Sequence, residues 1–466
     1  MCARPYFWFY GREKKKKRER SGHLNKLKTA VLCLISLVLT GCTSPNFSVE
    51  GLVDAPKLTE EQSQIHEALT KSVGSNITLK YPRNGDYRSA YVIANIDDEP
   101  DNEAIVFYEY KETNKEKGMK INILDTDEDG EWFSVKEVSG AGTDVDKVIV
   151  SQLGSGSDIN VVIGYMNQSA DEKTMEVYSY KDDDFKKIGT DTYSVLEAMD
   201  FDNNGRNDLV AIQKTVNAET EKITAKASLL KLEKGEIKRE MTIDMLDNVE
   251  SYVKVTRGLL ADGRHALFID GSTSDGNIQT ELLYYRYSTL QNPVQQRKEK
   301  LLSACTGNMD FRGTCMDIDG DGVVEIPSIK PMPGYENVET PQQKYLVTWN
   351  TYKDFYVLEE KYSGYQSNSS FIAFPKRWEG KVTVKTDIDT GEVIFYKYTG
   401  DVNTSTTELV RYCSGLKEDD EKLTAAGYEL ITSKGQLNYY VKIPKDKTEQ
   451  LVLTIDEVKN NFYPTE

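Results

Sequence analysis

Short apolar segments alternate with polar turns along most of this chain of 466 residues. From about Asn76 onward the segments are rich in β-branched and aromatic residues and are bounded by Asp, Asn and Gly, a pattern that predicts strands. The clearest are 89–94, 104–110, 147–150, 161–165, 174–180, 209–212 and 266–269. Short strands at even spacing predict an all-β repeat fold.

Two stretches have helical periodicity instead. Thr59 and Gln62 have the spacing of a capping box, and the apolar residues that follow recur at helical intervals until Gly74. We therefore expect a short helix over 59–74, packed on the flank of the domain. A second helical pattern over 416–426 predicts a small insertion near the C-terminus.

The C-terminal third is rich in strand patterns, at 345–349, 355–359, 371–374, 382–385, 393–398, 408–413, 439–443 and 450–455. Pro327, Pro331 and Pro333 predict an irregular loop, and loops on a rigid scaffold often carry binding surfaces. Trp349 and Trp378 could stack on sugars, but packing in the core is the favoured interpretation.

The N-terminus carries an export pattern. Basic runs precede a nearly continuous apolar segment over 29–39, which is long enough for a signal-peptide core and short for a membrane span. The segment ends in Leu39-Thr40-Gly41-Cys42, which resembles a bacterial lipobox. We therefore expect 1–41 to be a lipoprotein signal peptide and Cys42 to be diacylated. A translation start downstream of Met1 would explain the unusual first dozen residues.

The residues after the expected signal peptide divide into a tether and a main domain. The polar stretch 42–58 reads as a tether, and 75–466 as the main domain. The mature protein is expected to be extracytoplasmic and anchored to the lipid bilayer through Cys42.

The segment 315–325, CMDIDGDGVVE, has the highest density of acidic residues in a regular spacing. Related segments begin at 95 and 200, and eroded ones begin at 152 and 258. The intervals between the five starting positions are 57, 48, 58 and 59 residues. Such intervals suit four antiparallel strands with their turns, which is one blade of a β-propeller. Dividing the domain by about 55 residues predicts seven blades.

Oxygen ligands at positions one, three, five and nine of such a turn converge on one point, and the ion that suits them is Ca²⁺. The best set is Asp317, Asp319, Asp321 and Glu325 with the carbonyl of Val323. The second is Asp200, Asp202, Asn204 and Asp208 with the carbonyl of Arg206, and the third is Asn95, Asp97, Glu99, Asp101 and Glu103. The alternative is that these side chains only solvate the turns.

Other turn segments of the sequence are not expected to bind an ion. The eroded segments have Gly154 and Leu260 at the third position, so no ion is expected there. The run 125–130 begins with suitable ligands but falls out of phase and reads as a hairpin loop, as does 387–391.

The three segments with the most complete ligand sets, which begin at 95, 200 and 317, resemble the FG-GAP or VCBS-type repeats of integrin-like β-propellers. The order of lipobox, tether, helix and degenerate repeats resembles a group of bacterial lipoproteins from clostridial-type organisms. The resemblance implies a propeller whose acidic turns hold structural calcium.

Charge and cysteine content narrow the function further. From Cys42 onward the chain carries 48 basic and 73 acidic residues, a net charge of −25, which argues against nucleic acid as a partner. Cys305, Cys315 and Cys413 remain after signal cleavage, and a disulfide between Cys305 and Cys315 is one outcome that their spacing allows.

Enzyme signatures are scarce. Only His66 and His265 follow the signal segment, and the sequence contains no phosphate loop, GxSxG or HExxH. We therefore predict a binding or scaffold module at the cell envelope, with an envelope protein or glycan as partner. The alternative is an enzyme that acts on envelope glycan or peptidoglycan through a carboxylate pair.

Overall fold

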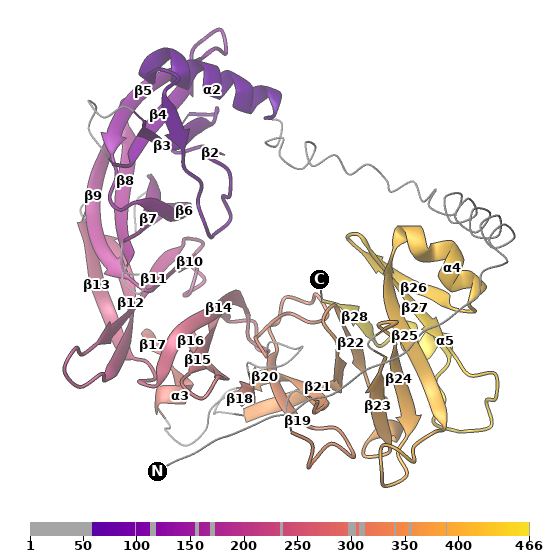
Figure 1. Ribbon diagram of the computed structural model, residues 1–466. Helices are drawn as coiled ribbons and strands as arrows, with labels where there is room; N and C mark the ends of the chain where they lie inside the picture. The colour runs from indigo at the N-terminus through magenta and orange to yellow at the C-terminus, as the bar shows by residue number, and fades with distance from the viewer. Residues whose placement is uncertain are drawn as a thin grey trace, which may run out of the picture. The chain divides into compact units, whose positions relative to one another are not determined.

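The computed structural model describes residues 58–97, 99–111, 118–153, 158–167, 173–233, 236–296, 304–306, 313–339, 342–353, 357–387 and 389–465. Contacts divide the chain into two units, Met1–Glu61 and Gln62–Glu466, and the second contains every sheet given below. The described residues are mainly β-structure, so the all-β prediction is confirmed (Figure 1).

Six antiparallel sheets follow one another along the chain. Sheet 1 contains β1 (Ile77–Leu79), β2 (Tyr91–Ala94), β3 (Glu103–Tyr110), β4 (Lys120–Thr126) and β5 (Trp132–Ser139). Sheet 2 contains β6 (Asp144–Gln152), β7 (Ile159–Met166), β8 (Lys173–Lys181) and β9 (Asp184–Tyr193). Sheet 3 contains β10 (Val195–Met199), β11 (Asp208–Val216), β12 (Ile223–Glu233) and β13 (Glu236–Asp244).

The remaining three sheets have five strands each. Sheet 4 contains β14 (Val249–Leu259), β15 (His265–Thr273), β16 (Asn277–Arg286), β17 (Thr289–Gln291) and β18 (Ala304–Thr306). Sheet 5 contains β19 (Ile326–Pro331), β20 (Tyr345–Lys353), β21 (Val357–Gln366), β22 (Ser370–Ala373) and the terminal β28 (Phe462–Pro464). Sheet 6 contains β23 (Val382–Thr386), β24 (Val393–Lys397), β25 (Glu408–Leu416), β26 (Glu429–Lys434) and β27 (Leu437–Lys442).

Each sheet packs face to face on the next, as strand β7 illustrates. Val161 and Ile163 belong to the apolar cluster shared with sheet 1, whereas Val162 belongs to the cluster shared with sheet 3. Successive side chains of a strand point to opposite faces, so a strand between two sheets must be apolar on both. This explains why β7 reads as a continuous apolar run. Strand β11 shows the same division between the clusters that it shares with sheets 2 and 4.

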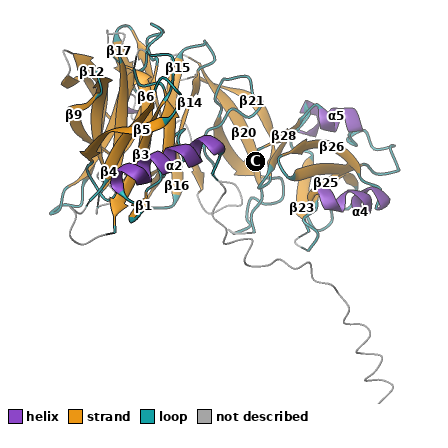
Figure 2. Ribbon diagram, turned by 90° about the horizontal axis from the view of Figure 1, so that it is seen from above, coloured by secondary structure: helices purple, strands orange, loops and turns teal. Residues whose placement is uncertain are grey.

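Helices cover the faces at the two ends of this packing order. Ile65 and Leu69 of α2 (Glu60–Val73) are fully buried against sheet 1, on the face that does not contact sheet 2 (Figure 2). At the other end, Leu423 of α4 (Asp420–Ala425) packs beside Cys413 and Tyr440 of sheet 6. Terminal units of a repeat array need such caps because one face lacks a neighbouring sheet.

The estimate of seven blades is not confirmed, since the described residues form six sheets. The two predicted helices are present as α2 and as the short pair η3 (Lys417–Asp419) and α4. The strand predicted over 450–455 is wrong. Thr454 caps α5 (Ile455–Lys459) there, through a capping box with Glu457, while Leu453 is buried.

The predicted proline loop is also partly wrong, because Pro327 and Pro331 lie within β19. This strand pairs with β20 along one side and is an edge of its sheet, the position at which a strand tolerates proline.

Candidate functional site: acidic turns and a polar pocket

Four of the five predicted turns connect two successive strands of one sheet, and the other leads into the first strand of sheet 5. Turns 95–103, 152–160, 200–208 and 258–266 join β2 to β3, β6 to β7, β10 to β11 and β14 to β15. Turn 317–325 joins Met316, which forms an isolated bridge with Glu325, to β19. A sixth turn, at 387–391, joins β23 to β24 and had been read only as a hairpin loop. We name these the first to sixth turns, after their sheets.

Turns of neighbouring sheets contact one another. Leu153 of the second turn forms a parallel bridge with Asn207 of the third, and Leu259 of the fourth forms one with Val323 of the fifth. Between the third and fourth turns, the His265 ring nitrogen Nδ1 contacts the carbonyl of Asp200. The turns therefore join successive sheets along one edge, a role that requires no metal.

Hydrogen bonds within the turns explain the spacing of the acidic residues. Asp317 accepts backbone N–H groups from Gly320 and Gly322 at 2.7 and 2.8 Å, and it thereby closes the loop from the inside. The ninth residue reaches back to the second. Glu325 accepts the N–H of Ile318 at 3.0 Å, as Glu103 accepts that of Ile96 at 2.7 Å.

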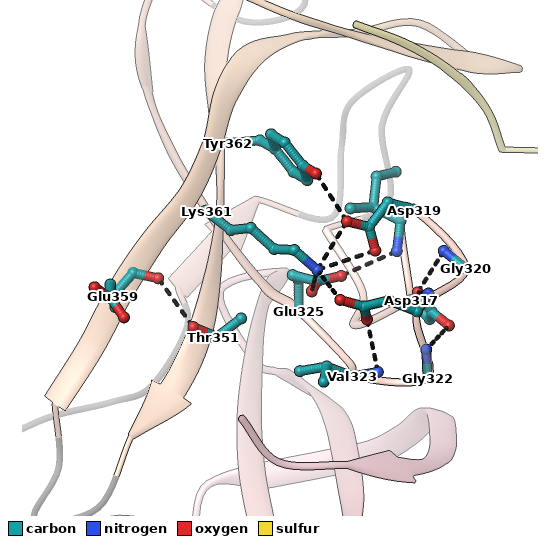
Figure 3. A network of polar contacts seen from close by, with 12 residues as sticks. Asp317, Asp319, Gly320, Gly322, Val323, Glu325, Thr351, Glu359, Lys361 and Tyr362 are labelled. Carbon is teal, nitrogen blue, oxygen red and sulfur yellow. Dashed lines mark hydrogen bonds and ion pairs between the residues drawn. The ribbon is translucent and has the colours of Figure 1, made fainter. Parts of the chain in front are cut away.

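A lysine side chain enters the fifth turn and contacts its carboxylates (Figure 3). Lys361 of β21 places its Nζ 2.8 Å from Asp319 Oδ2, 2.7 Å from Asp321 Oδ2 and 2.8 Å from Glu325 Oε1. Tyr362 donates its hydroxyl to Asp319 at 2.8 Å. Neither Lys361 nor Tyr362 was among the predicted site residues, because they lie on a strand far along the chain.

These contacts decide the charge state of the turn. Burial alone would lower the pKa of Lys361, but hydrogen bonds to Asp319, Asp321 and Glu325 outweigh it and raise the pKa. Burial tends to raise the pKa of Asp319, yet the bonds from Lys361 and Tyr362 lower it on balance. For Glu325 burial dominates and the pKa is raised. The ammonium of Lys361 and the carboxylate of Asp319 therefore stabilise each other in their charged forms.

The donor set of the fifth turn suits a cation. One carboxylate oxygen from each of Asp317, Asp319 and Glu325 lies within 4.8 Å of the others, so these residues could hold a metal ion. The same space contains the Lys361 ammonium, however, and a metal would have to displace it.

The third turn lacks such a lysine contact. Asp200 accepts the N–H groups of Asn204 and Gly205 at 3.0 and 2.8 Å, as in the fifth turn. Burial, followed by the negative charge of Asp202, raises the pKa of Asp208 to about 6. Asp202 and Asp208 line a cleft of about 420 Å³ together with Lys231. The positive charge of Lys231 partly offsets the raised pKa of Asp208, but Lys231 forms its ion pair with Glu240.

The first turn is also acidic, and no lysine or arginine of the described residues pairs with its Glu103. Glu103 is buried, and burial raises its pKa to about 7, with Asp97 and Asp125 adding to the shift. Asp125 comes from the out-of-phase run, which forms the loop between β4 and β5 as predicted. Glu99 and Asp101 are exposed. The sequence did not indicate that Asp125 lies near this turn.

The predicted disulfide is not present. Cys315 is a free and fully buried thiol, whose Sγ donates to Asp270 Oδ1 at 3.3 Å. Burial raises its pKa well above the usual value. The side chain of Cys305 lies outside the described residues. Cys413 is a second free thiol, buried in sheet 6.

A polar pocket that the sequence did not reveal lies on the first strands of three consecutive sheets. It has a volume of about 480 Å³ and is lined mainly by residues of β6, β10 and β14 and of the loop at 84–86. Lys173 at the start of β8 and Tyr193 at the end of β9 complete the lining. We call it the first-strand pocket. Its charged residues are Asp86, Asp146, Lys147, Lys173, Glu197, Lys254 and Arg257.

The charged walls of this pocket are fixed by their neighbours. Asp146 is fully buried and accepts hydrogen bonds from Asn84, Lys173 and Tyr193 at 2.7, 2.9 and 2.7 Å. Burial would raise its pKa, but the bonds from Tyr193 and Lys173 outweigh that effect and lower it. Such a network is organised before any ligand arrives.

Ion pairs also form between charged residues that line the pocket. Lys147 bonds to Glu197 Oε1 at 2.5 Å, and Arg257 bonds to Asp86 at 2.9 Å while its Nε lies 3.9 Å from Glu197 Oε2. Tyr252 also lines the pocket, but its hydroxyl is buried, where the charge of Glu281 acts on it. The pocket therefore offers both acceptors and donors to a polar ligand.

Gly164 of β7 leaves room for the Tyr193 hydroxyl of this network. A Cβ at this position would lie 2.0 Å from the hydroxyl of Tyr193, which is the group that reaches Asp146. Glycine is required here by close approach and not by backbone conformation.

The aromatic candidates belong to the core. Trp349 and Tyr352 are buried, and Trp378 is buried with its Nε1 donating to the carbonyl of Leu451 at 2.7 Å. Trp378 and the prolines Pro331 and Pro333 line another pocket, of about 550 Å³, beside sheets 5 and 6.

Two sequence predictions lie outside the described residues, namely the signal peptide over 1–41 and the lipidation site Cys42 with most of its tether. In the part of the chain that is described, no helix combines the length and apolar character needed to cross a membrane.

Comparison with known proteins adds little to this picture. Neither a family model nor a curated protein matches the chain. Among solved structures, a candidate 6-phosphogluconolactonase from Bacteroides fragilis is similar over 72% of this chain and 93% of its own, with 10% identity and a TM-score of 0.29. A rhamnogalacturonan lyase from Bacillus licheniformis is similar over 70% of this chain and 69% of its own, also with 10% identity and a TM-score of 0.29. Scores this low support no assignment of fold family or activity.

Proposed function

We propose that this chain is an extracytoplasmic lipoprotein, anchored through diacylated Cys42, whose row of sheets is a propeller-like binding module at the cell envelope. The observation that carries the binding role is the first-strand pocket, a polar concavity with charges held in place by neighbouring side chains. Its volume of about 480 Å³ falls within the range of small-ligand sites. The lipobox-like sequence at 39–42 carries the anchoring role.

The chemistry of the pocket favours a glycan that bears carboxylates. Arg257, which pairs with the exposed Asp86, can exchange that partner for an acidic group of the ligand, whereas Asp86 and Glu197 can accept bonds from sugar hydroxyls. The ammonium of Lys254 is engaged by the carbonyl of Cys315 at 2.8 Å. Four basic residues against three acidic ones make the pocket slightly cationic, on a chain whose net charge from Cys42 onward is −25. An acidic envelope glycan is therefore attracted to the pocket more than to the rest of the surface.

The repeat architecture supports the resemblance to FG-GAP or VCBS-type propellers. Turns of equivalent position recur in six consecutive sheets, and each sheet packs on the next. We propose Ca²⁺ as the ion that these turns take. The third turn, with Asp200, Asp202, Asn204 and Asp208, fits the ion best. Its carboxylates form no ion pair with a lysine or arginine of the described residues, and Asp202 and Asp208 open on a cleft. The first turn is the second site, through Asp97 and Glu103.

The alternative is an enzyme that cleaves envelope glycan. One observation favours it: Asp86 and Glu197 are two carboxylates that line a single pocket and both lie near Arg257. Measuring reducing ends released from peptidoglycan by the purified chain separates the two functions. Release that stops in a Glu197→Gln variant would favour the enzyme.

Two experiments test the proposal. For anchoring, cells that express the full chain are fed an alkyne-labelled fatty acid, and label on the wild type that is absent from Cys42→Ala is expected. For binding, the affinity of soluble peptidoglycan fragments is measured for the wild type and Arg257→Gln. We expect affinity to fall at least about tenfold, the equivalent of 1.4 kcal/mol.

Arg377→Gln is the matched control for the binding experiment. It removes an arginine that pairs with Glu457 at 2.6 Å beside sheet 6, outside the first-strand pocket. Equal binding by all three proteins would contradict the assignment of the pocket.

A further inference from the structure

The fifth turn has the most complete metal-binding pattern in the sequence, yet its centre contains a side chain. The Nζ of Lys361 lies between 2.7 and 2.8 Å from carboxylate oxygens of Asp319, Asp321 and Glu325. In Figure 3 the lysine extends from its strand into the turn, toward the carboxylates of Asp319 and Glu325. The arrangement resembles an ion in its coordination shell.

The number of donors matches the number of acceptors. An ammonium has three N–H groups, and here it donates one hydrogen bond to each of three carboxylates, at 3.0 Å to Asp319 Oδ1, 2.7 Å to Asp321 Oδ2 and 2.8 Å to Glu325 Oε1. The Glu325 side chain is fully buried, so its charge would be costly without a partner. Lys361 is one-fifth exposed, which leaves the cation mostly shielded from water.

The other oxygens of the turn are also engaged. Both oxygens of Asp317 accept backbone N–H groups of the turn. Asp321 Oδ1 accepts the N–H of Val323 at 2.8 Å, and Glu325 Oε2 that of Ile318 at 3.0 Å. An added divalent cation would meet a positive charge at the point where the free oxygens converge, and at such short separation the repulsion is severe.

The first and third turns differ in this respect. Among the described residues, no lysine or arginine forms an ion pair with Asp202 or Asp208 of the third turn, or with Glu103 of the first. Lys361 of β21 is one source of this difference. The turns themselves also differ, because Asn204 of the third turn stands where the fifth has Asp321, and Asp208 stands where it has Glu325.

We infer that Lys361 is the permanent counter-ion of the fifth turn, so that this turn binds no metal in the wild-type chain and becomes a Ca²⁺ site when the lysine is replaced by a neutral side chain. The third and first turns remain the sites for Ca²⁺, so the inference refines the calcium part of the proposed function. It stands independently of the first-strand pocket.

The test uses the full chain with Asp97→Asn and Asp202→Asn, which silence the first and third turns. Equilibrium dialysis at about 1 mM Ca²⁺, the range of extracellular calcium modules, measures bound ions with and without Lys361→Met. We expect no bound ion while Lys361 is present and about one per chain after its replacement. Adding Asp319→Asn should remove the new ion.

Lys353→Met serves as the matched control. Lys353 lies on the neighbouring strand β20, pairs with Glu359 and is about half exposed, so its replacement should create no site. A Ca²⁺ ion that binds with Lys361 intact, and is lost with Asp319→Asn, would overturn the inference, because metal would then displace the lysine.

Folding of the variant is itself informative. Lys361→Met that folds only when Ca²⁺ is added supports the inference. A variant that folds and binds no ion, or that stays unfolded with Ca²⁺, overturns it.

Discussion

The ammonium of Lys361 lies 2.8 Å from Oε1 of Glu325, a carboxylate that is fully buried at the end of an acidic turn. Lys361 lies on β21, Glu325 lies just before β19, and the two residues are 36 positions apart in the sequence. Their contact joins β21 to the turn that precedes β19. A turn that looks like a metal site therefore functions as a link between strands within sheet 5.

Replacing Lys361 with methionine should destabilise the chain when calcium is absent. The substitution keeps most of the aliphatic stem and leaves Glu325 buried without its partner. Breaking a buried pair costs about 3–5 kcal/mol, and we expect about 2 kcal/mol here because Lys361 is partly exposed. Urea denaturation in EDTA measures the change. Lys353→Met, which breaks an exposed pair, should cost less than about 0.5 kcal/mol; equal losses would contradict the role of Lys361.

Calcium should raise the melting temperature of the wild type through the third turn. A ligand that binds only the folded state adds about 2.7 kcal/mol of stability at one hundred times its dissociation constant. Thermal melts in excess EDTA and in excess Ca²⁺ measure this shift. Asp202→Asn should reduce it, whereas Asp319→Asn should leave it unchanged. A shift that depends on Asp319 and not on Asp202 would reverse our assignment of the sites.

Stability should depend on pH through Glu281 of β16. Its carboxylate is buried, and burial raises its pKa to about 7 although Asn292 and Leu246 donate to it at 2.8 and 2.9 Å. The folded chain therefore holds this proton more tightly than the unfolded chain. Stability should fall as the pH rises from about 4.5 to about 7, by up to about 3 kcal/mol, and then level off.

Glu281→Gln removes the titrating group and tests this account. The difference in unfolding free energy between about pH 4.5 and pH 8 should shrink in the variant relative to the wild type. An unchanged difference would mean that other groups are responsible for the pH dependence.

Gly164→Ala should disrupt the first-strand pocket. The added Cβ would overlap the hydroxyl of Tyr193 and push it away from buried Asp146, leaving that carboxylate one bond short. We expect a loss of about 2 kcal/mol in urea denaturation. The same substitution in a Tyr193→Phe background should cost less, because the clashing oxygen is gone. Equal costs in both backgrounds would show that the clash is not the cause.

The sequence predicted those parts of the structure that depend on local pattern. The strand segments, helix α2 and the acidic turns follow from residue spacing over a few positions. The sixth turn was predicted only as a hairpin, because it begins 70 residues after the fifth and has Gly391 at its fifth position and Phe395 at its ninth. The strand predicted at 450–455 failed because Leu451 and Leu453 are buried in an irregular segment before a capped helix.

Contacts between distant segments could not be predicted in this way. Lys361 is one of many lysines in strand-like sequence, and nothing near it indicates that it reaches Glu325. The first-strand pocket is lined by residues of three sheets and a loop, which lie between Asn84 and Arg257 in the sequence. No local sequence motif could therefore predict it. Asp125 joined the first turn for the same reason: pairing of β3 with β4 brings it there.

The most direct test of the account is the equilibrium binding of soluble peptidoglycan fragments to the full chain, with wild type, Arg257→Gln and Arg377→Gln compared. The account predicts saturable binding without cleavage of the fragments, weakened at least about tenfold by Arg257→Gln and unchanged by Arg377→Gln. Binding that is indifferent to Arg257, or fragments that are cleaved during the measurement, would contradict a glycan-binding module built on the first-strand pocket.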